Sequence, residues 1–594
     1  MRKELTKLRL LMKSSGIDVY VIPTSDCHGS EYVGDYFKCR EYISGFTGSA
    51  GTLVVTASEA GLWTDGRYFI QAENQLKESG IDLRKMGNPK VPTISGYLKS
   101  VLHAGMVLGY DGSCVMESEA RLYRQITQTT GATLSAENDL VGRIWAGRPA
   151  LSCEKAWILP DKYAGEKRSD KIGKVRQAMA EKGADLLLLA SLCDICWLLN
   201  VRGNDVESTP VALSYLTLTD EEVCWYVQDC VSQEIREELK KDGIRIRDYE
   251  KIYEDLSRIP GRKTVWYDPE MTNSLLVSSL PANVKHLEEM NPTMMLKAVK
   301  NPVEVENERQ AHIRDGVAVT RFIYWLKTRI GKEKITEISA GDYINKLRRD
   351  QENFVENSFD PIIAYGPHGA LPHYSAGPSS NVALEARGFL LADTGGHYLE
   401  GTMDITRTIA VGELTEEEKE IYTMVLRGHI GLSDTRFLPG CTGQSLDTLA
   451  RTPLWDQGRD YDHGTGHGVG YLLSVHEGPN SFRYQQAVDP RRQCVLQEGM
   501  ITSNEPACYL EGKFGVRIEN LVVCRKDHRP GFDRFLCFET LTMAPYERAA
   551  IIPERLTEKE RNWLNAYQEK VYETLAPLLS KEEADWLYKE TRAI

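Results

Sequence analysis

The sequence lacks the features that place proteins in membranes or outside the cell. Its longest apolar run, Leu186–Leu199, has only 14 residues and contains Asp194, too few to cross a hydrocarbon core of about 30 Å. The N-terminal stretch carries a charge every few residues and has no uninterrupted apolar segment like that of a secretory signal. We therefore expect a cytoplasmic protein with no membrane partner.

Positive charge and paired cysteines are also in short supply. The chain has 72 Lys and Arg against 85 Asp and Glu, a formal net charge of −13, which argues against nucleic acid as a partner. The 13 cysteines are odd in number and widely scattered, so reduced thiols are expected rather than a disulfide framework. Cys193 and Cys196 have the spacing of a zinc or redox pair, but their apolar surroundings favour buried thiols.

What the sequence does contain is enough apolar residue for several cores. With 594 residues, 42% of them hydrophobic, the chain is globular and long enough for three or four domains of about 100–200 residues each. An internal repeat divides the first half, because residues 7–22 and 174–189 each read as a helix, a glycine stop and an apolar strand. We therefore expect two α/β units, over residues 1–150 and 151–300.

The region from 301 to 594 has a different pattern of expected helices and strands. A long amphipathic helix is expected over residues 304–331, further helices over 416–434 and 444–456, and a helix in the tail after Pro553. Short strands separated by glycine-rich turns are expected over 359–411 and again over 498–545.

Histidine is concentrated in this third region. Seven of the twelve histidines lie within 109 residues. Isolated histidines are usually ordinary core or surface residues, and we expect this of His28, His103, His286, His312, His429 and His528. The remaining histidines stand in motifs and need another explanation.

The first motif, LLADTGGHYLEGTMDITRT, places Asp393 and Asp404 at the ends of two apolar strands. A carboxylate beside a strand core loses solvation unless a cation or hydrogen bonds compensate, so the pair suggests a metal site. Two solvated aspartates in a turn would produce the same pattern.

The second motif, DHGTGHGVGYLLSVHEGPN, contains His463, His467 and His476 among closely spaced glycines. Glycine at this density lets the backbone approach a ligand closely. A phosphate-binding loop is the rival interpretation, but the run has no Walker sequence and no basic residue. Metal ligation or acid–base chemistry by histidine fits better.

The third motif, NEPACYLEGKFGVRIEN, adds Glu505 and Glu519, with Arg517 expected on the same strand face as Glu519. Four carboxylates and one imidazole favour Mn²⁺, Co²⁺ or Zn²⁺ over a thiolate zinc site. This much negative charge suits two ions that share bridging carboxylates.

Taken in order, these motifs resemble those of aminopeptidase P, in the M24 metallopeptidase family with the pita-bread fold. The resemblance covers the whole chain. It implies an α/β (α+β) architecture in which two tandem creatinase-like domains precede a pita-bread catalytic domain over residues 301–594 with a helical tail. It also implies peptide substrates with proline in the second position and a homodimer.

The resemblance further implies a ligand set for two divalent metal ions, usually manganese, with zinc or cobalt as alternatives. Its members are Asp393, Asp404, His467, Glu505 and Glu519, with Asp404 and Glu519 bridging. A hydroxide between the metals would then attack the Xaa-Pro bond.

The resemblance gives five residues catalytic roles: His373, His463, His476, Glu505 and Arg517. The three histidines would bind peptide and stabilise the intermediate. Glu505 would carry a proton to the leaving proline nitrogen, and Arg517 would orient carboxylates.

Four residues depart from the family pattern: Ala507, Cys508, Pro372 and His368. We expect them to line the approach to the site and to alter substrate preference. An Xaa-Pro dipeptidase (prolidase) and a non-catalytic peptide-binding relative remain as alternatives. The prolidase shares the ligands but is typically shorter, whereas non-catalytic relatives lose the metal set that this chain retains.

Overall fold

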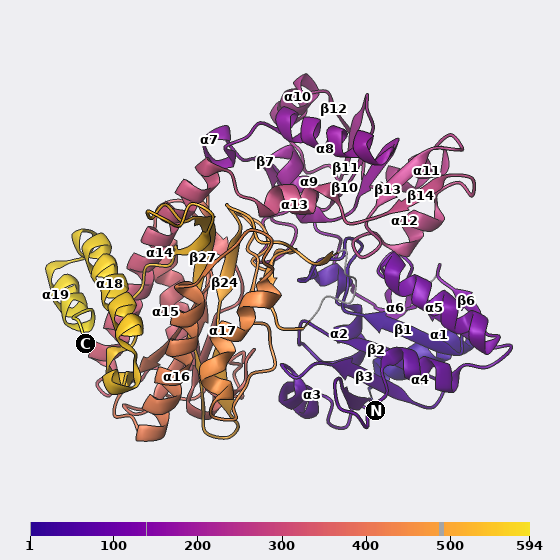
Figure 1. The fold of residues 1–594 in the computed structure, drawn as a ribbon. Coiled ribbons are helices and arrows are strands. Elements are labelled where there is room, and N and C mark those ends of the chain that lie inside the picture. The colour runs from indigo at the N-terminus through magenta and orange to yellow at the C-terminus, as the bar shows by residue number, and fades with distance from the viewer. Residues whose placement is uncertain (1, 138, 486–491) are drawn as a thin grey trace. The chain divides into compact units, whose positions relative to one another are not determined.

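The computed structural model describes residues 2–137, 139–485 and 492–594 (Figure 1). The chain forms two compact units. The N-terminal unit takes residues 1–159 and 167–293, and the C-terminal unit takes residues 160–166 and 294–594.

The N-terminal unit contains two six-stranded sheets that share one topology. The first has the order β4-β3-β2-β1-β5-β6 and the second the order β12-β11-β10-β8-β13-β14. In both, the central strand pairs antiparallel on one side and parallel on the other. The strands of the first sheet are β1 Val19–Pro23, β2 Thr52–Thr56, β3 Ala60–Thr64, β4 Asp82–Lys85, β5 Val107–Tyr110 and β6 Thr133–Ser135. Those of the second are β8 Leu186–Leu189, β10 Ser214–Leu218, β11 Val223–Val227, β12 Ile244–Asp248, β13 Thr264–Tyr267 and β14 Lys285–Glu288.

The predicted repeat is confirmed in these elements. Helix α1 (Lys3–Ser14) leads into β1 in the first copy, and α8 (Arg168–Lys182) leads into β8 in the second. Side chains of β1 alternate between two cores, because Tyr20 and Ile22 join one apolar cluster while Val19 and Val21 join another. Both faces of this sheet are therefore buried.

The apolar run that begins at Leu186 forms β8 and helix α9 (Leu192–Leu199) inside the second copy. Cys196 is fully buried and Cys193 is partly exposed. Among the described residues, no helix is long and apolar enough to cross a membrane.

The longest helix of the C-terminal unit is α14 (Pro302–Arg329). It starts two residues before the predicted position because Asn301 caps it, with Glu304 completing a capping box. Helix α15 (Glu337–Arg349) follows. Further helices are α16 (Glu416–Ser433), α17 (Gly443–Trp455), α18 (Glu558–Leu575) and α19 (Lys581–Glu590). Neither α15 nor α19 was predicted from the sequence.

Two antiparallel sheets form the frame of this unit. One has the order β16-β17-β20, with β16 Ile362–Tyr365, β17 Phe389–Thr394 and β20 Ile405–Ala410. The other has the order β21-β28-β27-β24, with β21 Arg436–Phe437, β24 Ile501–Asn504, β27 Asn520–Lys526 and β28 Leu536–Thr540. A small sheet has the order β15-β18-β19, with β15 Phe354–Asn357, β18 Gly396–Tyr398 and β19 Gly401–Thr402. Two antiparallel pairs add to this frame: β22 (Gly466–His467) with β23 (Ser481–Phe482), and β25 (Ala507–Leu510) with β26 (Phe514–Arg517).

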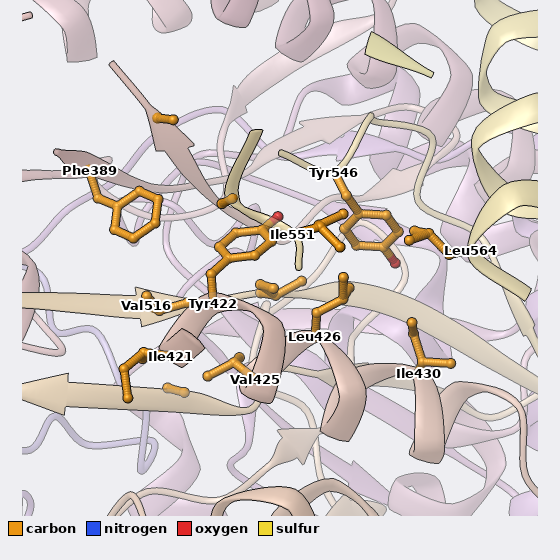
Figure 2. Packing of buried hydrophobic residues seen from close by; sticks show 14 of the residues in the cluster. Phe389, Ile421, Tyr422, Val425, Leu426, Ile430, Val516, Tyr546, Ile551 and Leu564 are labelled. Carbon is orange, nitrogen blue, oxygen red and sulfur yellow. The ribbon is translucent and has the colours of Figure 1, made fainter. Parts of the chain in front are cut away.

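A large apolar cluster joins these sheets to the helices (Figure 2). Helix α16 contributes Tyr422, Val425 and Leu426 to it, and Phe389 of β17 packs beside Tyr422 with ring centroids 5.9 Å apart. Leu564 of α18 belongs to the same cluster. The C-terminal helices are therefore part of the core that supports the strand ends.

Candidate metal centre

Asp393 and Asp404 approach each other because β17 and β20 are neighbours. Asp393 lies near the end of β17, directly opposite Thr406 of β20, and Asp404 immediately precedes β20. Both carboxylates are buried, at 9% and 5% exposure. Two acids held this close out of water need a compensating cation.

His467, at the end of β22, lies beside the carboxylate of Asp404. Its Nε2 lies 3.4 Å from Asp404 Oδ2 and 3.6 Å from Glu505 Oε1. Its Nδ1 lies 3.0 Å from the carbonyl oxygen of Gly468. Since a carbonyl oxygen only accepts, Nδ1 carries the proton, which leaves the Nε2 lone pair directed at the carboxylates.

Glu505 and Glu519 come from the second sheet. Glu505 follows β24, with its backbone N–H donating to Thr465 O at 2.8 Å. Glu519 lies in the link between β26 and β27, so the expectation of one strand through Arg517 and Glu519 is wrong, although both side chains reach the Thr406 hydroxyl. The link is held because the Glu519 N–H donates to Thr406 O, and the Thr406 hydroxyl donates to Glu519 Oε2 at 2.7 Å.

The donor atoms fall into three overlapping sets, each with all its atoms within 4.8 Å of one another. The sets are Asp404 with His467 and His476, His467 with Glu505 and Glu519, and Asp393 with Asp404 and Glu519. The structure thus brings together the five residues expected to bind metal. His476 lies beside two of them, Asp404 and His467.

The electrostatics of these carboxylates suit a cationic ligand. Burial, followed by repulsion from Asp404, raises the pKa of Glu519 well above its usual range. Burial also raises the pKa values of Asp393 and Glu505. Within the part of the chain that the structure describes, Asp393 Oδ1 is buried and accepts no hydrogen bond. The donor set therefore fits divalent cations, which would supply the missing positive charge.

Arg517 links this cluster to its surroundings. Its guanidinium donates to Asp393 Oδ2 at 2.6 Å, to the Tyr509 hydroxyl at 2.6 Å and to the Thr406 hydroxyl at 3.1 Å. Its side chain is 3% exposed, so these contacts are made away from solvent. Arg517 consequently fixes one oxygen of Asp393 and leaves the other open.

His463 belongs to the same hydrogen-bond network. Its Nδ1–H donates to Gly464 O at 2.8 Å, so Nε2 accepts from the Tyr509 hydroxyl at 3.0 Å. Burial, then the positive charge of Arg517, lowers the pKa of His463 to about 3. The imidazole is therefore neutral, with both ring nitrogens in use.

The other two expected histidines lie at different places around the cluster. The ring of His476 meets that of His467 edge-on, with centroids 4.3 Å apart. His373 is partly buried in the long connection between β16 and β17, next to Pro372, whose carbonyl accepts from Arg517 at 3.3 Å.

The expectation that all four departures from the family pattern line the approach is wrong for two of them. Ala507 and Cys508 are buried members of the same apolar cluster as Tyr422 and Leu426. His368 donates from Nδ1 to Glu337 at 2.8 Å and stacks on Tyr374, so it holds the loop that carries His373.

Sequence reasoning missed Tyr509 and Thr406. Tyr509 stands inside the NEPACY motif, but its place near Arg517 depends on the pairing of Ala507 with Arg517 across the hairpin, which the sequence does not show. No sequence signal distinguishes Thr406 from Thr408, the other hydroxyl residue of β20.

Comparison with known proteins places this site in a family. Residues 306–526 match the model of metallopeptidase family M24, and residues 534–594 match the C-terminal region of peptidase M24. Residues 4–138 and 147–304 each match a creatinase/prolidase N-terminal domain. A metallopeptidase with two such N-terminal domains is the class that these matches define.

Full-length relatives make the assignment more specific. A probable Xaa-Pro aminopeptidase P of Coprinopsis cinerea is 35% identical over 100% of this chain and 98% of its own length. Xaa-Pro aminopeptidase 1 of Dictyostelium discoideum is also 35% identical, over 100% of this chain and 96% of its own. The chain therefore belongs to the Xaa-Pro aminopeptidases of metallopeptidase family M24.

Solved structures agree with this assignment. The crystal structure of X-prolyl aminopeptidase from Caenorhabditis elegans, described as a cytosolic enzyme with a di-nuclear active site, superposes with a TM-score of 0.94. It is 33% identical and covers 100% of this chain and 99% of its own. An Xaa-Pro dipeptidase from Bacillus anthracis, 23% identical with a TM-score of 0.52, shares the fold over 65% of this chain and 100% of its own. The C-terminal unit accordingly has the pita-bread fold, and the protein is a metallopeptidase.

Proposed function

We propose that the protein releases the N-terminal residue from peptides that have proline in the second position. The observation that carries this proposal is the overlap of the three donor sets, which gather five carboxylate and imidazole ligands within one buried cluster. Full-length similarity to Xaa-Pro aminopeptidases supports the same substrate class over a prolidase.

We assign two divalent metal ions to this cluster, with Mn²⁺ as the preferred ion and Zn²⁺ or Co²⁺ as alternatives. Asp393, Asp404, His467, Glu505 and Glu519 would hold them. When bound, two such ions make water nucleophilic at neutral pH and polarise the carbonyl of the scissile bond.

The protein's own groups complete the reaction. Glu505, whose pKa burial raises, is suited to accept a proton and pass it to the leaving proline nitrogen. We assign His476 and His373 the donation of hydrogen bonds to peptide carbonyls. The contact of the His476 ring with His467 supports this role for His476. His463 has both ring nitrogens engaged, so we assign it to holding Tyr509, while Arg517 holds Asp393.

Proline selectivity follows from the chemistry of the substrate. The nitrogen of an Xaa-Pro bond has no N–H to donate, so a site for it needs room for the ring rather than a hydrogen-bond acceptor. The same nitrogen must gain a proton as it leaves, and the Glu505 carboxyl is proposed to supply it.

We also propose a cytoplasmic homodimer built from domains at residues 1–150, 151–300 and 301–594. Exposed apolar side chains around α17, namely Leu449, Trp455, Tyr484 and Val495, support an interface on the C-terminal unit. Light scattering should give twice the chain mass of 67.0 kDa. A particle of the single-chain mass would reject the dimer.

The activity is tested on an Xaa-Pro-Xaa tripeptide, an Xaa-Pro dipeptide and a proline-free tripeptide, with chelated enzyme before and after adding Mn²⁺. We expect metal-dependent cleavage of the first substrate alone. Asp404→Asn is the control, because it should lose both bound metal and activity. Cleavage of the dipeptide alone would indicate a prolidase, and no cleavage with any metal would reject the enzymatic proposal.

A further inference from the structure

Glu477 is a buried carboxylate that the proposed reaction does not use. Its side chain is only 2% exposed, and it follows His476 directly in the chain. Its Oε1 lies 2.8 Å from Lys300 Nζ and its Oε2 lies 3.1 Å from Lys297 Nζ. Both ammonium groups are buried as well, with side chains 2% and 5% exposed.

Burying these three charged groups away from water costs desolvation free energy. Desolvation of buried ions commonly cancels their mutual attraction, and apolar side chains of similar size often stabilise a protein equally well. Net stability therefore does not explain why one carboxylate is held between two lysines. A requirement for fixed geometry does.

The lysines are well placed to impose such geometry. Lys297 lies on helix α13 (Pro292–Ala298), and Lys300 lies just before the cap of α14. The Lys300 N–H donates to Gly499 O at 3.1 Å, and the Asn301 side chain donates to Ala164 O at 2.8 Å. The backbone that carries Lys300 is thus fixed on both sides.

Glu477 is tied in turn to the histidine loop. Its N–H donates to Gly468 O at 2.8 Å, and the Gly468 N–H donates to Asn480 O at 2.8 Å. A Cβ atom on Gly470 would lie 2.8 Å from Glu477 Oε2, so only glycine lets the loop pass so close. His467 and His476, whose rings meet at 4.3 Å, are the neighbours of these two bonded residues.

We propose that Lys297 and Lys300 are positioning residues that act through Glu477 to hold His476 against His467 and Asp404. This lysine clamp rests on the proposed function, because it assigns the lysines to the geometry of that same site. The clamp is built into the start of the C-terminal unit, far in sequence from the histidine that it orients.

The test compares Lys300→Met and Glu477→Gln with Lys327→Met. The control residue also pairs a buried carboxylate with a lysine, because Lys327 Nζ lies 2.7 Å from Glu547 Oε2. We expect the clamp variants to lose about 10- to 100-fold in kcat with little change in KM. Lys327→Met should keep kcat within about twofold.

A double-mutant cycle separates positioning from general destabilisation. If the clamp acts through His476, then His476→Ala combined with Lys300→Met should lose no more kcat than His476→Ala alone. Losses that multiply in the double variant would overturn the proposal, as would an unchanged kcat in Glu477→Gln.

A second measurement does not depend on activity. Amide hydrogen exchange of the metal-free protein should quicken over residues 468–480 in both clamp variants and not in Lys327→Met. Unchanged exchange there would overturn the proposal even if the wild-type protein cleaved no peptide. An inactive wild type with faster exchange in the variants would reject the proposed function and keep the clamp.

Discussion

At the scale of single residues, Tyr509 links Arg517 to His463 through its hydroxyl group. Its hydroxyl accepts from Arg517 and donates to His463. In Tyr509→Phe both groups lose a buried hydrogen bond, which costs about 1–3 kcal/mol. We expect roughly a tenfold to hundredfold drop in kcat with metal content unchanged.

Steady-state kinetics and metal analysis of the purified variant check this prediction. Wild-type kcat in Tyr509→Phe would exclude the hydroxyl from the site chemistry.

His429 gives the C-terminal unit a defined acid sensitivity. Burial, then the charge of Arg407, lowers its pKa from 6.5 to about 3. The unfolded chain therefore binds a proton below pH 6.5 that the folded chain does not, and stability falls as pH falls from 6.5 towards 3. This single group should cost about 2 kcal/mol between pH 7 and pH 5.

Urea unfolding of His429→Gln in chelator is the measurement. Glutamine can still donate to Asn504 O and accept from Tyr546, as the neutral imidazole does. The difference in unfolding free energy between pH 7 and pH 5 should shrink by about 2 kcal/mol relative to wild type. An equal difference in both proteins would contradict the assignment.

The residues that could be predicted from sequence are those whose chemistry is unusual for their surroundings. Asp393 and Asp404 beside apolar strands, and His467 among glycines, stand out because an ordinary core would not accept them. Tyr509 and Thr406 could not be singled out, because a tyrosine or threonine on a buried strand is unremarkable until its partner is known.

At the scale of elements, two helices meet at a glycine. A Cβ on Gly428 of α16 would lie 2.1 Å from the carbonyl oxygen of Ala450 on α17. Gly428→Ala must therefore push the helices apart, and we expect a loss of about 1–2 kcal/mol in unfolding free energy.

Gly341→Ala on α15 is the matched control. There the new Cβ would be in ordinary contact, 3.6 Å from Ile363 Cγ1, so the better helix propensity should stabilise the protein by about 1 kcal/mol. Denaturant midpoints of the two variants measure both effects. Shifts of the same sign would show that packing at Gly428 is not tight.

Helix ends were easier to predict than strand neighbours. The start of α14 agrees with the expectation to two residues because the helical spacing of charged and apolar residues is local in sequence. The expected strand through Arg517 and Glu519 is interrupted instead, since Arg517 ends a hairpin and Glu519 pairs across to Thr406, 113 residues away. Such long-range pairing leaves no periodic trace in the sequence.

At the scale of the whole molecule, every proposed metal ligand lies in the C-terminal unit. A bound ion should stabilise that unit by about 2.7 kcal/mol at a hundredfold excess over its dissociation constant. We expect Mn²⁺ added to chelated protein to slow amide exchange in that unit, most strongly at its site strands.

Mass spectrometry of peptides from the exchanged protein measures the rate of amide exchange in each unit. The two six-stranded sheets of the N-terminal unit should exchange at the same rate with and without metal. Protection spread evenly over both units would contradict the assignment of all ligands to one of them.

The shared topology of the two N-terminal sheets also indicates how this part of the chain arose. Both place six strands in one order with the same pattern of parallel and antiparallel neighbours, and each central strand follows a helix. Independent origin of two such mixed sheets in succession requires every choice of neighbour and direction to coincide. Tandem duplication of one ancestral gene segment requires a single event, after which the loops of each copy were free to diverge while the sheets kept their topology.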